Sequence, residues 1–233
     1  MSEQTEIFDL ATGHSLIDVR GGGFDSALSV GGRPIVFNWC DCEGSVGQYL
    51  ARAGRIDCEK ELRSLRHTLD GNWLPDVPIS SQIYPFLELF VPGHYRLRRV
   101  ESCPDCDTTE FDAAWDFARS HDSFYPFGTT LVFTQSTDSL DHNRVAHYVE
   151  RIRCGHRPIA LTATAAEGWC EFVLDGHHKL TAYKMAGVAP TFVSVCRLDA
   201  PRLTPESFED FIGAGHPLSR HYRKVKSKHD AKP

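Results

Sequence analysis

The sequence lacks any run of about eighteen apolar residues, which is the length that a membrane-spanning helix needs. Its first ten residues, MSEQTEIFDL, are acidic and do not have the basic and then apolar layout of a secretory signal. A hydrophobic content of 41% over 233 residues is ordinary for a globular protein with a core. We therefore expect a cytoplasmic protein with no membrane partner.

An excess of basic charge is also absent, because 25 Lys and Arg residues stand against 31 Asp and Glu residues, a net charge of -6 with His neutral. Such a body does not attract nucleic acid in general. Basic residues gather only in the tail SRHYRKVKSKHDAKP, at Arg220, Arg223, Lys224, Lys226, Lys228 and Lys232. Since this composition buries little apolar surface, we expect a mobile, solubilising tail, with nucleic-acid binding as the less favoured alternative.

The first half contains no repeat and no strand–loop–helix context for a nucleotide loop, so the run Gly21 to Gly23 indicates a flexible turn. Apolar residues at helical spacing predict helices over residues 58–69 and 109–120. The segments PFLELF and HYRLRRV, joined by a Pro-Gly turn, predict a hairpin. Residues 1–128 therefore form a mixed α/β region of unknown fold.

Eight cysteines in a chain without a signal peptide indicate thiols or metal ligands rather than a disulfide framework. Cys40 and Cys42 form a C-x-C pair, and Cys103 and Cys106 form a C-x-x-C pair in a turn. Two such pairs could share a structural zinc ion, because each turn directs two thiolates at one point. The alternative is reduced cysteines that pack as small hydrophobic side chains.

After residue 128 the pattern becomes clear: strand, helix, strand, strand, helix, strand. Asp141 is placed as the N-cap of the first helix, and Gly155 follows its end. The third strand ends at Asp175, and Gly176 allows a sharp turn before a helix that starts near His178.

The stretch Asp175-Gly176-His177-His178-Lys179 therefore lies where a strand passes into a helix. Unpaired amides and the positive dipole end of that helix favour an anion, and the two histidines and the lysine add donors. A phosphate group fits this chemistry. The alternative is an ordinary helix start at which Asp175 caps the amides. Neither His178 nor Lys179 is expected to belong to the core.

The segments RVAHYVERIRCGHRPIAL, FVLDGHHKLTAYKMAGV and PTFVSV together resemble the ParB/sulfiredoxin-like superfamily, in which a strand ending in D-G-H-H-R precedes a helix. The resemblance covers less than a third of the chain and implies an α+β fold with a ParB/sulfiredoxin-like domain at residues 129–200. Residues 201–233 would be a C-terminal extension with the basic tail.

The resemblance also implies a ligand. Family members that bind ATP, ADP or CTP hold the phosphates with the residues that match Gly176, His177, His178 and Lys179, while the first helix lines the opposite wall. Lys179 replaces the usual arginine, so charge is kept and the bidentate fork is lost. Sulfinic-acid repair is excluded, because it needs a cysteine where this chain has His177. DNA segregation is disfavoured, because too few residues follow for a helix-turn-helix region.

The free serine kinase branch resembles this chain best at the motif itself. Those enzymes use a glutamate after the first strand as base, whereas this chain has Gln135, which cannot accept a proton, followed by Asp138. We predict Asp175, His177 and Asp138 as catalytic residues in magnesium-dependent phosphoryl transfer or hydrolysis, with ATP, ADP or another nucleotide and a small-molecule acceptor. The alternatives are a non-catalytic nucleotide sensor and a nuclease whose metal ligands are Asp175 and Asp138.

Overall fold

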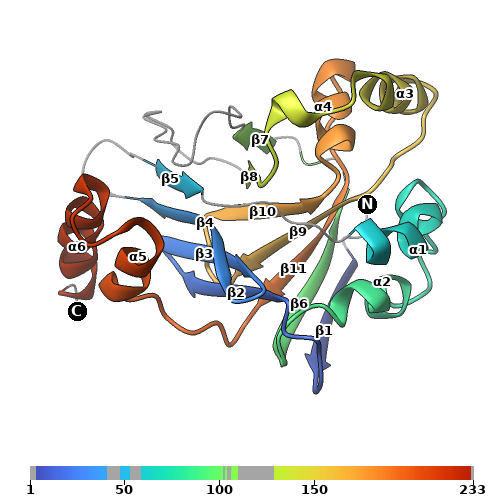
Figure 1. The fold of residues 1–233 in the computed structure, drawn as a ribbon. Coiled ribbons are helices and arrows are strands. Elements are labelled where there is room, and N and C mark those ends of the chain that lie inside the picture. The colour runs from blue at the N-terminus through green and yellow to red at the C-terminus, as the bar shows by residue number, and fades with distance from the viewer. Residues whose placement is uncertain are drawn as a thin grey trace.

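The computed structural model describes residues 4–40, 48–52, 59–101, 103, 106–109 and 129–231. Its described residues form two β-sheets and six α-helices (Figure 1). The predicted α+β class is therefore confirmed. Within the described ranges, no helix is long and apolar enough to cross a membrane.

The larger sheet has seven strands in the order β1-β6-β11-β9-β10-β8-β7. Its strands are β1 Gln4–Leu10, β6 Gly93–Val100, β7 Cys106–Thr109, β8 Thr129–Phe133, β9 Ala160–Ala165, β10 Cys170–Asp175 and β11 Phe192–Arg197. The pairs β11–β9, β10–β8 and β7–β8 are parallel, and the other neighbours are antiparallel. The four strands from after residue 128 are neighbours in this order, and strands from before it flank them on both sides, so the sheet is continuous across the predicted boundary between 1–128 and 129–200.

The order of elements predicted after residue 128 is confirmed. Strand β8 leads through a 3-10 turn, Thr137–Ser139, into helix α3, His142–Arg153; strands β9 and β10 follow, then helix α4, His177–Ala186, and β11. Asp141 is the N-cap of α3, since its carboxylate accepts the amide of Asn143 at 2.8 Å.

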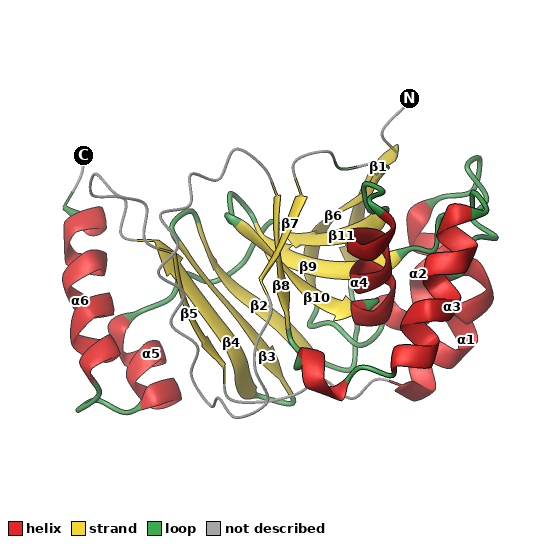
Figure 2. Cartoon of the chain, turned by 90° about the horizontal axis from the view of Figure 1, so that it is seen from above, coloured by secondary structure: helices red, strands yellow, loops and turns green. Residues whose placement is uncertain are grey.

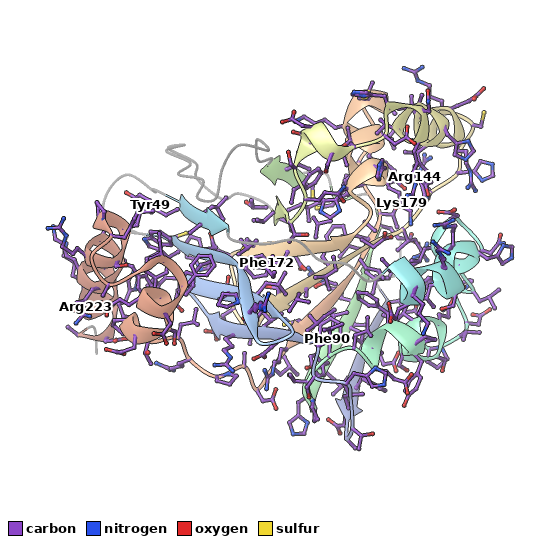
Figure 3. The ribbon with its side chains drawn as sticks, viewed as in Figure 1. Tyr49, Phe90, Arg144, Phe172, Lys179 and Arg223 are labelled. Carbon is purple, nitrogen blue, oxygen red and sulfur yellow. The ribbon has the colours of Figure 1, made fainter. Side chains whose placement is uncertain are left out.

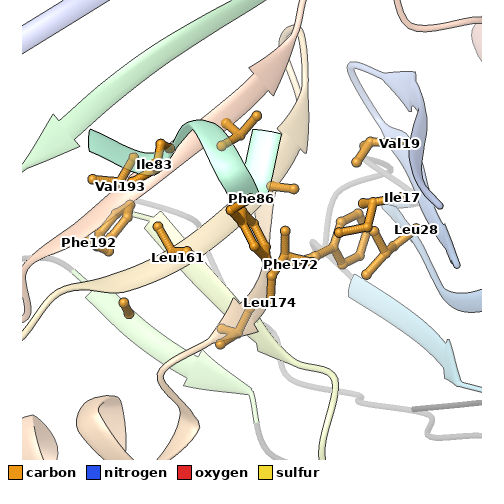
Figure 4. Packing of buried hydrophobic residues seen from close by; sticks show 14 of the residues in the cluster. Ile17, Val19, Leu28, Ile83, Phe86, Leu161, Phe172, Leu174, Phe192 and Val193 are labelled. Carbon is orange, nitrogen blue, oxygen red and sulfur yellow. The ribbon is translucent and has the colours of Figure 1, made fainter. Parts of the chain in front are cut away.

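The smaller sheet is an antiparallel meander of four strands, in the order β2-β3-β4-β5. Its strands are β2 Ile17–Gly22, β3 Asp25–Val30, β4 Arg33–Cys40 and β5 Gln48–Arg52. One face packs on the larger sheet, where Ile17 and Leu28 approach Phe172 in the shared core (Figure 4). Helices α5, Pro205–Ile212, and α6, Pro217–Asp230, cover the other face (Figure 2).

Helix α1, Glu59–Leu69, agrees with the helix predicted over residues 58–69. The predicted hairpin is wrong, because its expected first strand, PFLELF, begins inside helix α2, Ile79–Leu87. This helix contains Pro85 and buries Ile83 and Phe86. Strand β6 pairs instead with β1 and β11. The helix expected over residues 109–120 lies, apart from Thr109 at the end of β7, outside the described residues.

The expectation of a mobile basic tail is also wrong. Helix α6 packs on the smaller sheet with Tyr222 and Val225 buried. Lys226 is only 7% exposed, because its ammonium group lies 3.4 Å from the Asp25 carboxylate. The Tyr222 hydroxyl donates to the same carboxylate at 2.7 Å. This segment packs as a helix because Tyr222 and Val225 are three residues apart on one face, and because Asp25 neutralises the buried Lys226.

We expect Tyr222→Phe to lower the free energy of unfolding by about 1–3 kcal/mol, because a buried carboxylate loses a hydrogen-bond donor. Burial already raises the pKa of Asp25, and Tyr222 and Lys226 oppose that shift. Urea unfolding followed by circular dichroism measures the change. Tyr84→Phe, at a side chain that is 43% exposed, is the matched control. Equal stability of the two variants would show that the Tyr222–Asp25 bond does not hold α6.

Candidate functional site

The passage from β10 into α4 is built around Gly176. This residue has a φ of 104°, in the left-handed region that glycine adopts most easily. A Cβ atom at this position would lie 2.6 Å from the Cβ of Ala160, on the neighbouring strand β9. Gly176 is thus needed for both the turn and the close approach of the loop to the sheet.

The two motif histidines hold the loop that joins β8 to α3. His177 Nε2 accepts the backbone N–H of Thr134 at 3.2 Å, at the start of that loop. His178 Nε2 accepts the backbone N–H of Asp141 at 3.0 Å, at its end. Because both Nε2 atoms act as acceptors, each ring carries its proton on Nδ1 in this arrangement. The histidines therefore fix both ends of the loop over the start of α4.

Lys179 is buried, with 4% of its surface exposed. Its ammonium group donates to the Ile159 carbonyl at 3.0 Å and to Asp175 Oδ2 at 3.2 Å, and it lies 3.5 Å from Asp70 Oδ1. The expectation that Lys179 lies outside the core is therefore wrong. Three oxygen acceptors compensate the loss of water that burial imposes on the charge.

Asp70, immediately after α1, brings the first half of the chain into this site. The Tyr148 hydroxyl on α3 donates to Asp70 Oδ1 at 3.1 Å, and Arg151 donates to the Asp70 carbonyl at 2.6 Å. The Lys179 ammonium also lies 5.9 Å from the centre of the Tyr148 ring. Helices α1, α3 and α4 therefore meet at one buried cation.

Burial and nearby positive charges shift the pKa values of two motif residues. Burial raises the pKa of Asp175, but the charge and the hydrogen bond of Lys179, with a smaller contribution from the Arg144 charge, outweigh it, so the net shift is downward and the carboxylate stays ionised. Burial and the nearby Arg144 charge lower the pKa of His178. Arg144, in the first turn of α3, thus faces the loop; Figure 3 labels it next to Lys179.

The amino-terminal ends of α3 and α4 converge at this loop, since His178 in the first turn of α4 contacts the N-cap of α3. Gly176 is the N-cap of α4, and no side chain caps that helix. The alternative in which Asp175 caps the α4 amides is thus not observed. The Asp141 carboxylate already accepts amides at the start of α3, so the uncapped amides of α4 and the Arg144 guanidinium are the groups that favour an anion here.

Asp138 lies on the loop that the histidines hold. Its side chain is exposed on the 3-10 turn, and its backbone N–H donates to Ser136 Oγ at 3.3 Å. The Gln135 amide donates to Ser139 Oγ at 2.9 Å, which stabilises the same turn. Of the three predicted catalytic residues, Asp138 is the exposed one, while His177 is buried and Asp175 is paired with Lys179.

The two carboxylates that contact Lys179 do not fit a protein-held magnesium ion. Asp70 and Asp175 share the Lys179 ammonium, so a lysine fills the position where a divalent cation would bridge them. Among the residues that the structure describes, no cluster of three or more His, Cys, Asp or Glu side chains could hold a metal.

The predicted zinc ligands are only partly described. Cys42 lies outside the described residues. Cys40 ends β4, where its thiol is close enough to Cys170 to influence that residue's pKa, whereas Cys103 and Cys106 line a pocket beside Tyr183 of α4. The zinc site stays a prediction.

The motif did not reveal every residue of the site. Arg144 and Tyr148 carry a readable signal, because they are four residues apart on the helix expected to line the opposite wall. Asp70 carries none, since it follows a helix in the other half of the chain. No family model, curated protein or solved structure matches the chain, so membership of the ParB/sulfiredoxin-like superfamily stays a prediction.

We expect Gly176→Ala to destabilise the protein more than Gly155→Ala. Gly155 has a similar φ of 93° but nothing within 4 Å of the added Cβ, so its substitution should cost about 1–2 kcal/mol from the backbone alone. Gly176→Ala adds a clash with Ala160 and should cost about 1–3 kcal/mol more. Chemical denaturation of both variants measures the difference, and equal losses would show that the loop has room to move away from β9.

We expect His178 to make stability depend on pH. Its pKa is lowered below its ordinary value of 6.5, so the unfolded chain takes up the proton first and stability rises with pH. The contribution of His178 to the free energy of unfolding is complete above pH 6.5 and is lost as the pH falls through the folded pKa. The slope of this loss is no more than roughly 1.4 kcal/mol per pH unit. Unfolding free energies from pH 5 to 8, wild type against His178→Gln, measure it. His156→Gln, at an exposed histidine, controls for the loss of an imidazole. An unchanged slope in His178→Gln would contradict the role of this ring.

Proposed function

We propose that this protein binds a nucleotide, with the phosphates at the start of α4 beneath the β8–α3 loop. The observation that carries the proposal is the start of α4, which has no side-chain cap at its glycine turn and is faced by Arg144 from the first turn of α3. Anions bind at such ends because backbone N–H groups and the helix dipole act together. The D-G-H-H resemblance supports the same ligand independently.

In this proposal, backbone amides of residues 177–179 bind the phosphate oxygens, and the Arg144 guanidinium supplies a charged donor from the facing helix. The Lys179 ammonium acts from within the protein, where it holds Asp175 and Asp70 and keeps the loop in place. The His177 and His178 rings position the β8–α3 loop. These roles differ from the expected ones, in which the side chains of Lys179 and both histidines bind phosphate directly.

We further propose that the nucleotide is used for phosphoryl transfer or hydrolysis. The hydroxyl of a small-molecule acceptor, or water, would attack the terminal phosphorus; a new O–P bond forms, the bond to the nucleoside diphosphate breaks, and the proton passes to Asp138. Asp138 suits this role because its carboxylate is exposed on the held loop. Asp175 is then a positioning residue. Magnesium would arrive on the phosphates of the nucleotide.

A second candidate is a nucleotide sensor without catalysis. It is favoured by the fact that the ionisable residues of the motif are already engaged: Asp175 with Lys179, and the histidines with the loop amides. The nuclease alternative has less support, because its metal would compete with the Lys179 ammonium for Asp175.

We expect Arg144→Gln to weaken nucleotide binding roughly tenfold or more, because a charged donor to phosphate is lost. Thermal melts with a panel of ATP, ADP, CTP and GTP, with and without magnesium, identify the ligand by the rise in melting temperature. Titration calorimetry then gives the affinity. Arg153→Gln, at an exposed arginine in the last turn of the same helix, is the matched control. Equal affinity of the two variants would place the ligand elsewhere.

Nucleotide consumption by the wild type separates the enzyme from the sensor. If product forms, Asp138→Asn should abolish most turnover and keep binding, whereas Asp76→Asn, at an exposed and remote carboxylate, should leave both unchanged. Full turnover by Asp138→Asn would end the role of this residue as base. Binding without turnover in the wild type would assign the protein to the sensor class.

A further inference from the structure

Strand β1 lies at one end of the larger sheet (Figure 1). Among the residues that the structure describes, β6 is the one strand that pairs with it. All seven residues of β1, Gln4–Leu10, pair with β6 in regular register. The side of β1 that faces away from β6, here called the open edge, therefore presents a regular row of backbone N–H and C=O groups. Such a row is a template for a further strand.

The other outer strands of the two sheets are shorter. Strand β7, at the opposite end of the larger sheet, has four residues, and β5 of the smaller sheet has five. Strand β2 has six, and the Gly21 amide at its end already donates to the Pro201 carbonyl. Strand β1 is thus the longest outer strand that the structure describes. It contains no proline, lysine or β-bulge, which are features that commonly obstruct the edge of a sheet.

The two acids of β1 do not obstruct the open edge, because each already has a partner. The Glu6 carboxylate accepts the backbone N–H of Ser80 at 3.0 Å and also the hydroxyl of the same residue. The Asp9 carboxylate accepts His94 on β6, and this hydrogen bond raises the pKa of His94. Neither carboxylate is therefore an isolated charge that would repel an incoming strand.

Apolar side chains lie on both faces of the sheet at this edge. Ile7 is 63% exposed, on the face that it shares with Arg96 of β6. On the other face, the Phe8 ring packs against Tyr84 of α2, with 6.4 Å between the ring centres. The Tyr84 side chain is itself 43% exposed. Because successive residues of a strand alternate between the faces, an added strand would contact Ile7 on one face and these two rings on the other.

We propose that β1 pairs antiparallel with β1 of a second copy of this chain, with the two-fold axis at Ile7. Such an axis, perpendicular to the sheet, sets one residue opposite itself and joins the two larger sheets into one. All seven residues of β1 then take part. The resulting pairs are Ile7 with Ile7, Thr5 with Asp9, Glu6 with Phe8, and Gln4 with Leu10.

This register is self-complementary in charge. No two like charges are opposite each other, and the Thr5 hydroxyl of each copy lies opposite the Asp9 carboxylate of the other, to which it can donate. The exposed Ile7 side chains meet at the axis. Two apolar β-branched side chains directly opposite each other stabilise a pair of strands.

The neighbouring registers are less favourable. An axis at Glu6 sets two carboxylates directly opposite each other, which destabilises the pair. An axis at Phe8 sets the exposed Ile7 opposite a charged residue, Asp9. Either axis also shortens the overlap from seven residues of β1 to five, Gln4 to Phe8 or Glu6 to Leu10. The axis at Ile7 is therefore the one that combines the longest overlap with apolar contact and complementary charge.

Sedimentation of the purified full chain over a range of concentrations tests this interface. We expect an equilibrium between monomer and dimer, because a single pair of strands makes a small interface. Ile7→Lys sets two ammonium groups opposite each other at the axis and should raise the dimer Kd roughly tenfold or more. Thr5→Lys is the matched control: it adds the same charge to the same edge, but opposite Asp9, and should form dimers at least as well as the wild type. Circular dichroism verifies that each variant is folded.

Ile7→Cys provides a second measurement that does not depend on the affinity of the dimer. In the proposed register two thiols lie directly opposite each other, so mild oxidation should link two copies through residue 7. Thr5→Cys should not link through residue 5, because its two thiols would be four residues apart along the strands, roughly 13 Å. Mass spectrometry of the linked peptides separates these bonds from any bond between native cysteines.

A monomer at every concentration, with no link through residue 7, would overturn the proposal and leave the open edge to a strand of another protein. A dimer that Ile7→Lys leaves intact would place the interface elsewhere on the chain. Equal loss of the dimer in Thr5→Lys and Ile7→Lys would overturn the axis at Ile7. These outcomes are independent of the proposed nucleotide site, since three strands separate β1 from β10 in the sheet.

Discussion

The buried ammonium group of Lys179 is the contact that joins the parts of this protein. Its acceptors come from the residue after α1, from the segment before β9 and from the end of β10. Each acceptor replaces water that the ammonium group loses on burial, so removing one of them would leave part of the hydrogen-bonding capacity of a buried charge unsatisfied. Because Asp70 also accepts Tyr148 from α3, the position of one lysine determines how three helices meet.

This constraint changes the meaning of the D-G-H-H-K motif. Its side chains act mainly within the protein: the lysine joins segments, the aspartate pairs with it, and the histidines hold the β8–α3 loop. In the proposed function, a ligand therefore contacts the uncapped backbone at the start of α4 and the facing guanidinium of Arg144. A site of this type recognises negative charge and leaves the identity of the rest of the ligand to the surrounding loop.

The features that could be predicted from the sequence are those that depend on short stretches of the chain. The order of elements after β8, the Asp141 N-cap and the Gly176 turn follow from periodicity and turn chemistry within short windows. The contact of Asp70 with Lys179 could not be predicted, because it joins distant segments without a periodic signal. The tail was misread for a related reason: its charges indicated a solvated segment, while Asp25, far away in the chain, neutralises Lys226 and allows α6 to pack. The segment before β6 was read as a strand because a short apolar run does not separate strand from buried helix.

Regular alternation along β10 would place Glu171, Val173 and Asp175 on one face of the sheet. The pairing with β9 has an irregularity here: Val173 is opposite Thr162, and Asp175 is opposite Leu161, the very next residue. Two residues of β10 thus advance against one of β9, as in a β-bulge, which re-aims the side chains that follow. Asp175 therefore turns to the Leu161 face, toward Lys179 and Asp70, while the Glu171 carboxylate accepts the Thr162 hydroxyl. One irregular step in a single strand thus gives two acids, which regular alternation would place on one face, separate sets of partners.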